Sequence, residues 1–371
     1  MGFKRFIIVM QLKKKERVAG ILLLCAIVIH VYSLYPRRVE EGYSLRFFPA
    51  VSRFLRSVFG PLPFSIGDIL YAAIVIFFCI KIFVFFRFVF SRKRRESYRY
   101  KLREGIVTAF TATSVMYILF NILWGINYNR IGIAGQLGLK IEKYSVEELK
   151  TINSLLIKKI NSSKQVLLLN NKPYPSEKEL FDMTATAYTQ IGEKYAFLKY
   201  RPASIKSSMW GSIGNYTGFV GYYNPFTGEA QVNTTVPAFT QPFTACHETA
   251  HQLGYAKEME ANFVGYLAAS ASKDTLFHYS VYADLFSYAN RTLYFADSAV
   301  ALQYRKMLLP EVLSDFKARR KFNDEHKSFA EPVFKTLYGL FLRGNRQPMG
   351  MLSYDEVTGF IIAYYKKFGI I

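Results

Sequence analysis

Three long runs of apolar residues occupy the first third of this 371-residue sequence and restrict its fold more than any other feature. They cover about residues 18–35, 67–88 and 105–126, and away from their ends the only charged residue is Lys81. A helix rises about 1.5 Å per residue, so about 20 residues cover the roughly 30 Å hydrocarbon core of a bilayer. The sequence therefore predicts three transmembrane helices.

Two other interpretations of these runs are less consistent with the sequence. A cleaved signal peptide does not fit the first run, because no small-x-small cleavage site precedes Pro36 and two further runs follow. Buried core helices usually carry a polar stripe, whereas the second run has only Lys81 near its end, where the ammonium can reach the interface. The third run is the least apolar, so two spans remain the alternative.

The distribution of charge limits the class of partner. The net charge of +21 allows a nucleic-acid binder or a protein of the membrane surface. Residues 1–126 hold 20 Lys and Arg against 6 Asp and Glu, a net +14, which leaves 28 against 21, a net +7, for the other 245 residues. The basic clusters flank the apolar runs and no nucleic-acid-binding motif accompanies them. We therefore expect contacts with a lipid bilayer and no nucleic acid.

The same charges predict an orientation. By the positive-inside rule, the N-terminus and the loop 87–103 are cytoplasmic, and everything after residue 126 lies outside. We therefore expect a multi-pass membrane domain, residues 1–126, and an extracytoplasmic domain, residues 127–371. The amphipathic, Arg-bearing stretch 45–59 is expected at the membrane interface.

The second domain is predicted to be mainly helical with a small β-hairpin. Capping boxes begin helices at Ser145 and Ser176, and residues 146–160 and 177–195 have helical apolar spacing. Residues 207–233 instead combine five Gly with alternating aromatic residues, and the turn sequence 224–228 separates two short strands. The helical pattern then returns almost to the end of the chain.

One short motif carries recognisable chemistry, the HExxH sequence formed by His247, Glu248 and His251. Two His residues four apart lie on the same face of a helix and can bind one metal ion, while the Glu beside them can take a proton from water. Pro242 can begin this helix and Gly254 can end it. The motif predicts a Zn²⁺ site with His247 and His251 as ligands and Glu248 as the catalytic base.

A catalytic zinc site needs a third protein ligand. The metzincin position, six residues after His251, holds Lys257, which cannot ligate. A turn at Gly254 would let a second helix present Glu258 to the metal, with Glu260 as the competing ligand. The stretch 258–262 resembles the second motif of gluzincin metallopeptidases, although it follows the HExxH at a shorter distance. That resemblance implies Glu258 as zinc ligand and Asn262 as a hydrogen-bond partner of a ligating His.

The full set of motifs resembles a known family. The features that carry the resemblance are three N-terminal spans, the sequence WGINY from residue 124, NPFTGEA from 224, HETAHQLGY from 247 and EMEAN from 258. The chain is similar to an uncharacterised bacterial membrane-protein family that carries a domain of unknown function and is regarded as zinc-metallopeptidase-like. The resemblance implies a zincin-like α+β domain in a bacterial inner (cytoplasmic) membrane protein, and it supplies no substrate.

These features predict a membrane-anchored zinc metallopeptidase that hydrolyses periplasmic or membrane-proximal polypeptides, with Glu248 activating the water. We expect the substrate backbone to pair along residues 229–233 and the oxyanion to find a donor among Tyr222, Tyr223 and Tyr354. Two alternatives stay open, a non-catalytic metal-bound sensor or assembly protein of the envelope, and a zinc amidase acting on cell-wall peptides. The sequence does not define the oligomeric state.

Overall fold

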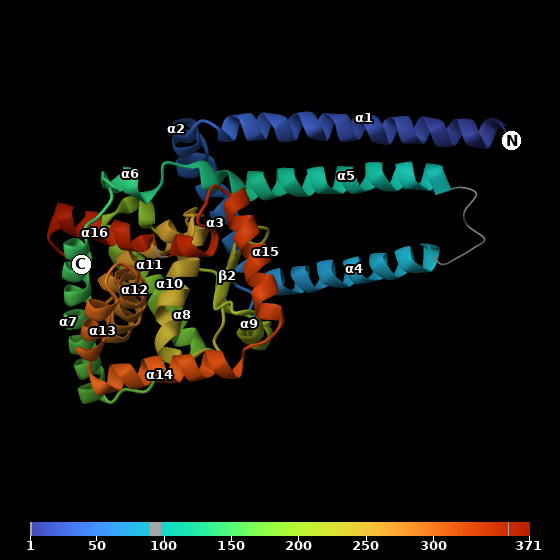
Figure 1. Cartoon of the computed structure of the whole chain (residues 1–371). Coiled ribbons are helices and arrows are strands. Elements are labelled where there is room, and N and C mark those ends of the chain that lie inside the picture. The colour runs from blue at the N-terminus through green and yellow to red at the C-terminus, as the bar shows by residue number, and fades with distance from the viewer. Residues whose placement is uncertain (1, 90–97, 355) are drawn as a thin grey trace.

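The computed structural model describes residues 2–89, 98–354 and 356–371. The chain is mainly helical, and three long helices extend from one side of a globular part that contains a small sheet (Figure 1). The predicted combination of apolar helices and a mainly helical domain with a small sheet is therefore confirmed.

The three long helices are α1 (Gly2–Ser33), α4 (Ile66–Val89) and α5 (Tyr98–Leu123). Each contains a segment long and apolar enough to cross a membrane, namely Leu12–Ser33, Ile66–Arg87 and Arg103–Leu123. Helices α1 and α5 lie side by side, while α4 stands apart from them (Figure 1). The three predicted helices are thus confirmed, which suggests a membrane protein, while their orientation stays a prediction.

The third long helix ends three residues earlier than the sequence suggested. Trp124 leaves the helical conformation, and residues Gly125–Asn129 form the 3-10 helix η3. A Cβ at Gly125 would come within 2.5 Å of the Phe120 ring, so only glycine allows the chain to turn this closely. The turn carries the Trp124 side chain into the globular part instead of the bilayer.

The segment between the first two spans packs against the globular part. It forms α2 (Pro36–Arg38), the π-helix η1 (Val39–Phe47) and α3 (Phe48–Phe59). One face of α3 is buried there, and its Ser52 hydroxyl donates to the Gln252 carbonyl at 2.8 Å. Phe54 and Val58, on another face, are exposed. Within the amphipathic stretch 45–59, the polar Ser52 and Arg56 are therefore buried against the globular part.

The globular part is built around a bundle of helices. Both predicted capping boxes are present, at Ser145 with Glu148 and at Ser176 with Glu179. The main core lies between α7, α8, α10, α11, α12 and α16. The helices of this part, in chain order, are α6 (Ile133–Leu137), α7 (Val146–Asn170), α8 (Glu177–Lys194), η4 (Ala196–Leu198), α9 (Gly211–Thr217), η5 (Ala238–Thr240), α10 (Gln241–Gln252), α11 (Glu258–Ala271), α12 (Thr275–Ala296), α13 (Ser298–Lys306), α14 (Pro310–Glu325), α15 (Ala330–Gly344), η6 (Gly350–Tyr354) and α16 (Val357–Phe368).

The sheet has three short strands, β1 (Ile205–Ser207), β2 (Gly221–Asn224) and β3 (Glu229–Val232), in the order β1-β3-β2. β2 and β3 form the predicted hairpin, with Gly221 opposite Val232, and β1 pairs with β3 in parallel. The expectation that a peptide would pair along residues 229–233 is wrong, because β3 already has a neighbour on each side. The edge strands are β1 and β2.

A second, smaller apolar cluster joins the spans to the globular part. It combines residues before α4, residues after α5 and residues of the globular part: Val39, Tyr43, Phe48, Trp124, Ile126, Tyr128, Tyr223 and Ala256. The Tyr43 hydroxyl donates to the Ile122 carbonyl at 2.9 Å, and Ser44 donates to the Asn127 side chain at 2.9 Å. The base of the spans and the globular part therefore share one packed junction.

Candidate metal centre

The HExxH motif lies on α10, a helix that is buried along almost its whole length. Pro242 occupies its first turn, where a missing N–H costs nothing. The helix ends at Gln252, and Gly254 follows with φ of +84°, a conformation that favours glycine. A Cβ there would come within 2.8 Å of the Phe48 ring. The predicted helix and its stop signal are confirmed.

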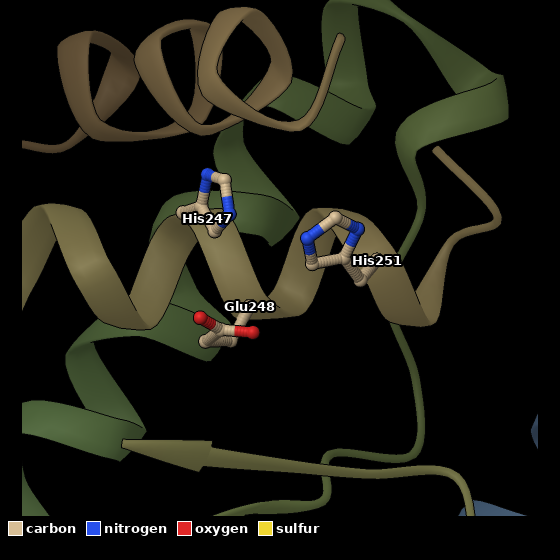
Figure 2. Close-up of side chains that lie close together, drawn as sticks. All are labelled: His247, Glu248 and His251. Atoms are coloured by element: carbon tan, nitrogen blue, oxygen red, sulfur yellow. The ribbon is translucent and has the colours of Figure 1, made fainter. Parts of the chain in front are cut away.

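His247 and His251 project from the same side of α10, as helical spacing requires (Figure 2). Their ring centroids are 4.8 Å apart. The Nδ1 of His251 lies 2.7 Å from the Tyr255 carbonyl oxygen. A carbonyl only accepts, so Nδ1 carries the hydrogen in the neutral ring and Nε2 keeps its lone pair for a metal ion.

Glu258, the first residue of α11, brings its carboxylate to both rings. Its Oε2 lies 3.2 Å from His247 Nε2 and 3.7 Å from His251 Nε2. Ligands at about 2.0–2.1 Å from a tetrahedral zinc ion are about 3.3 Å apart, so these separations suit a shared ion. Burial by itself would raise the pKa of the Glu258 carboxyl, but the neighbouring His247 and His251 rings hold that pKa well below its usual range.

Glu248 leaves α10 on a different side from the histidines (Figure 2). Its carboxylate lies against the edge strand β2, where a Cβ on Gly221 would come within 2.6 Å of Glu248 Oε1. Burial raises the pKa of this carboxyl to about 7, although His247 and His251 act in the opposite direction. The buried Oε2 of Glu248 has no hydrogen-bond partner within the part of the chain that the structure describes.

The competing ligand, Glu260, faces other groups. Its carboxylate contacts Gly132 and lies 3.8 Å from the Lys257 ammonium. Asn262 is buried on α11, one turn after Glu258. α11 crosses α10 closely there, since a Cβ on Gly265 would come within 3.1 Å of the His247 backbone nitrogen. The structure therefore brings Glu258, and not Glu260, to the two histidines, while the role expected for Asn262 stays a prediction.

Two polar residues that hold Glu258 come from the C-terminal part of the chain. The Tyr338 hydroxyl, on α15, donates to Glu258 Oε1 at 2.7 Å. The Glu258 backbone N–H donates to the Gln347 side-chain oxygen at 2.8 Å. No sequence signal points to either residue, because they lie 80 and 89 positions from Glu258 and belong to no recognisable motif.

The C-terminal end of α10 is held by residues from the base of the spans. The Trp124 indole N–H donates to the His251 carbonyl at 3.2 Å. The buried Arg130 donates to the Gly254 carbonyl at 3.2 Å and pairs with Glu40, whose oxygens lie 2.7 and 3.0 Å from the guanidinium nitrogens. These contacts fix the turn that joins α10 to α11, and so they fix the relative position of His251 and Glu258.

The tyrosines proposed as oxyanion donors have different surroundings. The Tyr222 hydroxyl bonds to Asp68 at the start of α4, and the buried Tyr223 ring packs 5.2 Å from the Trp124 ring. The side chain of Tyr354 lies outside the described residues.

His247, Glu248 and His251 form a buried group that could hold a metal ion, since one ligand atom from each lies within 4.8 Å of the others. The addition of Glu258 Oε2 gives two imidazoles and a carboxylate, a donor set that suits a divalent transition metal. The geometry therefore fits the predicted group, while the identity of the metal remains a proposal.

Comparison with known proteins gives one match. Residues 43–362 match a family described as "Protein of unknown function (DUF3810)", and because this range covers most of the chain, the chain belongs to that family. No curated protein and no solved structure matches the chain. The predicted resemblance to a family with a domain of unknown function is confirmed, and the description of that family names no reaction.

Proposed function

We propose that the chain is a membrane-anchored, zinc-dependent metallopeptidase that hydrolyses periplasmic or membrane-proximal polypeptides. One observation carries the proposal: Glu258 Oε2 stands 3.2 and 3.7 Å from the Nε2 atoms of His247 and His251, while Glu248 points to another side of α10. Three residues thus converge as candidate ligands, and the Glu248 carboxylate lies beside them, with one oxygen within 4.8 Å of a ring nitrogen of each histidine. A purely structural zinc site would instead be closed, usually by Cys.

His247, His251 and Glu258 would hold the ion. A zinc ion there supplies Lewis-acid chemistry, polarising a carbonyl and lowering the pKa of water toward 7. Glu248 would accept the proton of the attacking water and deliver it to the leaving amine. Tyr338 would keep the Glu258 carboxylate in position through its hydrogen bond to Oε1.

The free edge of strand β2 favours a polypeptide as the substrate. It has β3 on one side only, and its Gly221 lies against Glu248. An extended peptide that adds a strand beside β2 would pass next to the Glu248 carboxylate, because Gly221 carries no side chain to separate them.

The full chain, purified in detergent, tests the proposal through two measurements. Bound metal is measured by elemental analysis, and cleavage of unfolded and membrane-protein substrates is compared between the wild type and Glu248→Gln. We expect bound zinc in both proteins and cleavage only by the wild type. Absence of zinc, or equal cleavage by the wild type and Glu248→Gln, would refute the proposed enzymatic function. Zinc without any cleavage would favour the sensor or assembly role, and cleavage confined to cell-wall peptides would favour the amidase.

The ligand set is tested separately with a matched pair of variants. Glu258→Gln should lose most of its bound zinc, because an amide oxygen is a weaker ligand than a carboxylate. Glu260→Gln makes the same change two residues away and should retain the metal, since Glu260 faces Lys257 and Gly132. The reverse result would make Glu260 the third ligand.

A further inference from the structure

Helix α15 exposes a continuous apolar stripe on one face. The stripe consists of Val333, Leu337 and Leu340, at helical spacings of four and three, and Phe329 at the start of the helix extends it. Leu337 is 61% exposed and Val333 is 58% exposed. An amphipathic helix of a soluble protein would turn such a stripe toward the core. Something outside the globular part must therefore cover it.

The position of α15 indicates what covers the stripe. The helix runs across the direction of the three spans, at the end where they join the globular part (Figure 1). Near its C-terminal end, the Phe341 ring lies 6.3 Å from the ring of Phe120, which belongs to the membrane-crossing segment of α5. This end of α15 is therefore level with the last turn of a span.

The other end of α15 is tied to α4 by a chain of aromatic rings. Phe334 lies 6.1 Å from Phe219, Phe219 lies 5.5 Å from Tyr222, and Tyr222 lies 6.0 Å from Tyr71 in the apolar segment of α4. With 15 residues, α15 is about 22 Å long and so reaches from one span toward the other. The exposed stripe therefore lies on a helix whose two ends pack toward the bases of α5 and α4.

We propose that α15 lies in the plane of the membrane interface and buries its apolar stripe in the bilayer. The neighbouring α9 extends the same surface through exposed Ile213 and Tyr216, and the Ser328 hydroxyl just before α15 donates to the Tyr216 carbonyl at 2.6 Å. Lipid is the occupant that the geometry favours, because the helix that carries the stripe lies between the bases of α4 and α5, whose exposed apolar side chains a bilayer must already surround.

The proposal also places the candidate metal centre close to lipid. On a different face of α15 from the stripe, Tyr338 bonds to Glu258, so the site and the bilayer lie on two sides of one helix. A helix with its side chains is about 10 Å across. If the chain is the peptidase proposed above, on which this step rests, its substrates are polypeptide segments just outside the bilayer. An extended chain covers that distance in about three residues.

Spin labels on single cysteines test the placement without reference to metal or activity. The full chain, with Cys25 and Cys79 replaced by Ala, carries one new cysteine in each variant and is reconstituted into pure lipid vesicles. Cys246 is buried and stays in place, and a variant with no added cysteine measures its background labelling. The measured quantity is the ratio of collisions with oxygen, which concentrates in lipid, to collisions with a water-soluble nickel chelate.

Four positions give matched comparisons. Val333→Cys and Leu337→Cys report on the stripe. Val75→Cys, which is 60% exposed in the α4 span, is the lipid reference. Leu169→Cys, which is 85% exposed on α7 at the end of the globular part away from the spans, is the water reference (Figure 1).

We expect the oxygen-to-nickel ratios at Val333→Cys and Leu337→Cys to shift toward that of Val75→Cys. Ratios equal to that of Leu169→Cys would overturn the proposal, because the stripe would then face water. Labels shielded from both reagents would also overturn it, since only a second copy of the chain could cover the stripe in pure lipid. Loss of zinc or of peptidase activity would leave these ratios unchanged, so the two proposals fail independently.

Discussion

The buried pair Arg130–Glu40 offers the sharpest test of how the base of the spans supports the candidate centre. Glu40 follows the first span, yet its carboxylate accepts from the Arg130 guanidinium, from the Gly132 N–H at 3.1 Å and from Gln136 at 3.0 Å. Arg130 in turn holds the Gly254 carbonyl between the two motif helices. Glu40→Gln removes the negative charge with almost no change of shape.

The expected loss of stability follows from burial. The Arg130 and Glu40 side chains are 1% and 8% exposed, so the substitution leaves a buried guanidinium without its counter-charge. Breaking such a pair costs about 3–5 kcal/mol, and the glutamine oxygen can still accept one hydrogen bond, so we expect about 3 kcal/mol. In a globular part of this size, that corresponds to a decrease in melting temperature of about 6–12 °C.

Thermal unfolding of the full chain in detergent, followed by tryptophan fluorescence at a fixed scan rate, measures this change. Glu41→Gln is the matched control, since it makes the same substitution one residue later. Glu41 belongs to the exposed pair with Arg37, in which the side chains are 62% and 85% exposed. Exposed pairs contribute about 0.3–0.5 kcal/mol, so the control should melt within about 2 °C of the wild type.

The pH dependence of the difference in melting temperature between the wild type and Glu40→Gln provides a second check. Burial alone would raise the pKa of the Glu40 carboxyl, but the bonds from Arg130, Gly132 and Gln136 outweigh burial and lower it. A carboxyl with a lowered pKa stabilises the fold above its unfolded pKa and loses that contribution as the pH falls through its folded pKa. The difference in melting temperature between the wild type and Glu40→Gln should therefore reach its whole value at pH 7 and decrease below about pH 4. Equal melting temperatures for the wild type and Glu40→Gln at pH 7 would refute this account of the junction.

Three further substitutions probe the site itself. Tyr338→Phe should weaken zinc binding about 10-fold or more in a chelator competition, because it removes the hydrogen bond that positions the third candidate ligand. Gly221→Ala should abolish most cleavage while zinc content stays normal, because the new methyl group displaces Glu248, whereas Gly344→Ala, which has open space around it, should leave cleavage unchanged. Trp124→Phe should lower the melting temperature by about 2–4 °C, since the hydrogen bond to the carbonyl of the second motif histidine is worth about 1 kcal/mol. Normal zinc affinity, normal cleavage and an unchanged melting temperature would contradict the three predictions in turn.

Features that depend on local sequence were predictable. The apolar runs mark the long helices, the boxes at Ser145 and Ser176 mark helix starts, and Gly254 marks the turn between the motif helices. Each signal rests on residues within a few positions of one another. The position of Glu258 beside both histidines was predictable for the same reason, because a single short turn separates the two helices.

Features that depend on distant pairing were not predictable. The prediction of β3 as an edge strand is wrong because the sequence does not predict β1. β1 is only three residues long and pairs in parallel with β3, so it has no alternating pattern that would indicate a strand. Tyr338 and Trp124 reach the site from 80 and 127 residues away. A helix at the membrane interface and a helix packed against protein are both amphipathic. The pattern of the stretch 45–59 therefore could not show that Ser52 would donate a hydrogen bond to the end of the motif helix.

The junction of the spans and the globular part has a consequence for how the protein can be divided. A fragment that begins at residue 127 would lack Trp124, Phe48 and Ser52, so the His251 carbonyl would lose the hydrogen bond from Trp124 and the Gln252 carbonyl would lose the one from Ser52. Tyr223 and Ala256 would lose the apolar partners that cover them. The junction is completed only when the segment before α4, the turn after α5 and the globular part meet in one molecule. We therefore expect a chain in which α1, α4 and α5 have not packed at this junction to lack a correctly positioned candidate metal centre.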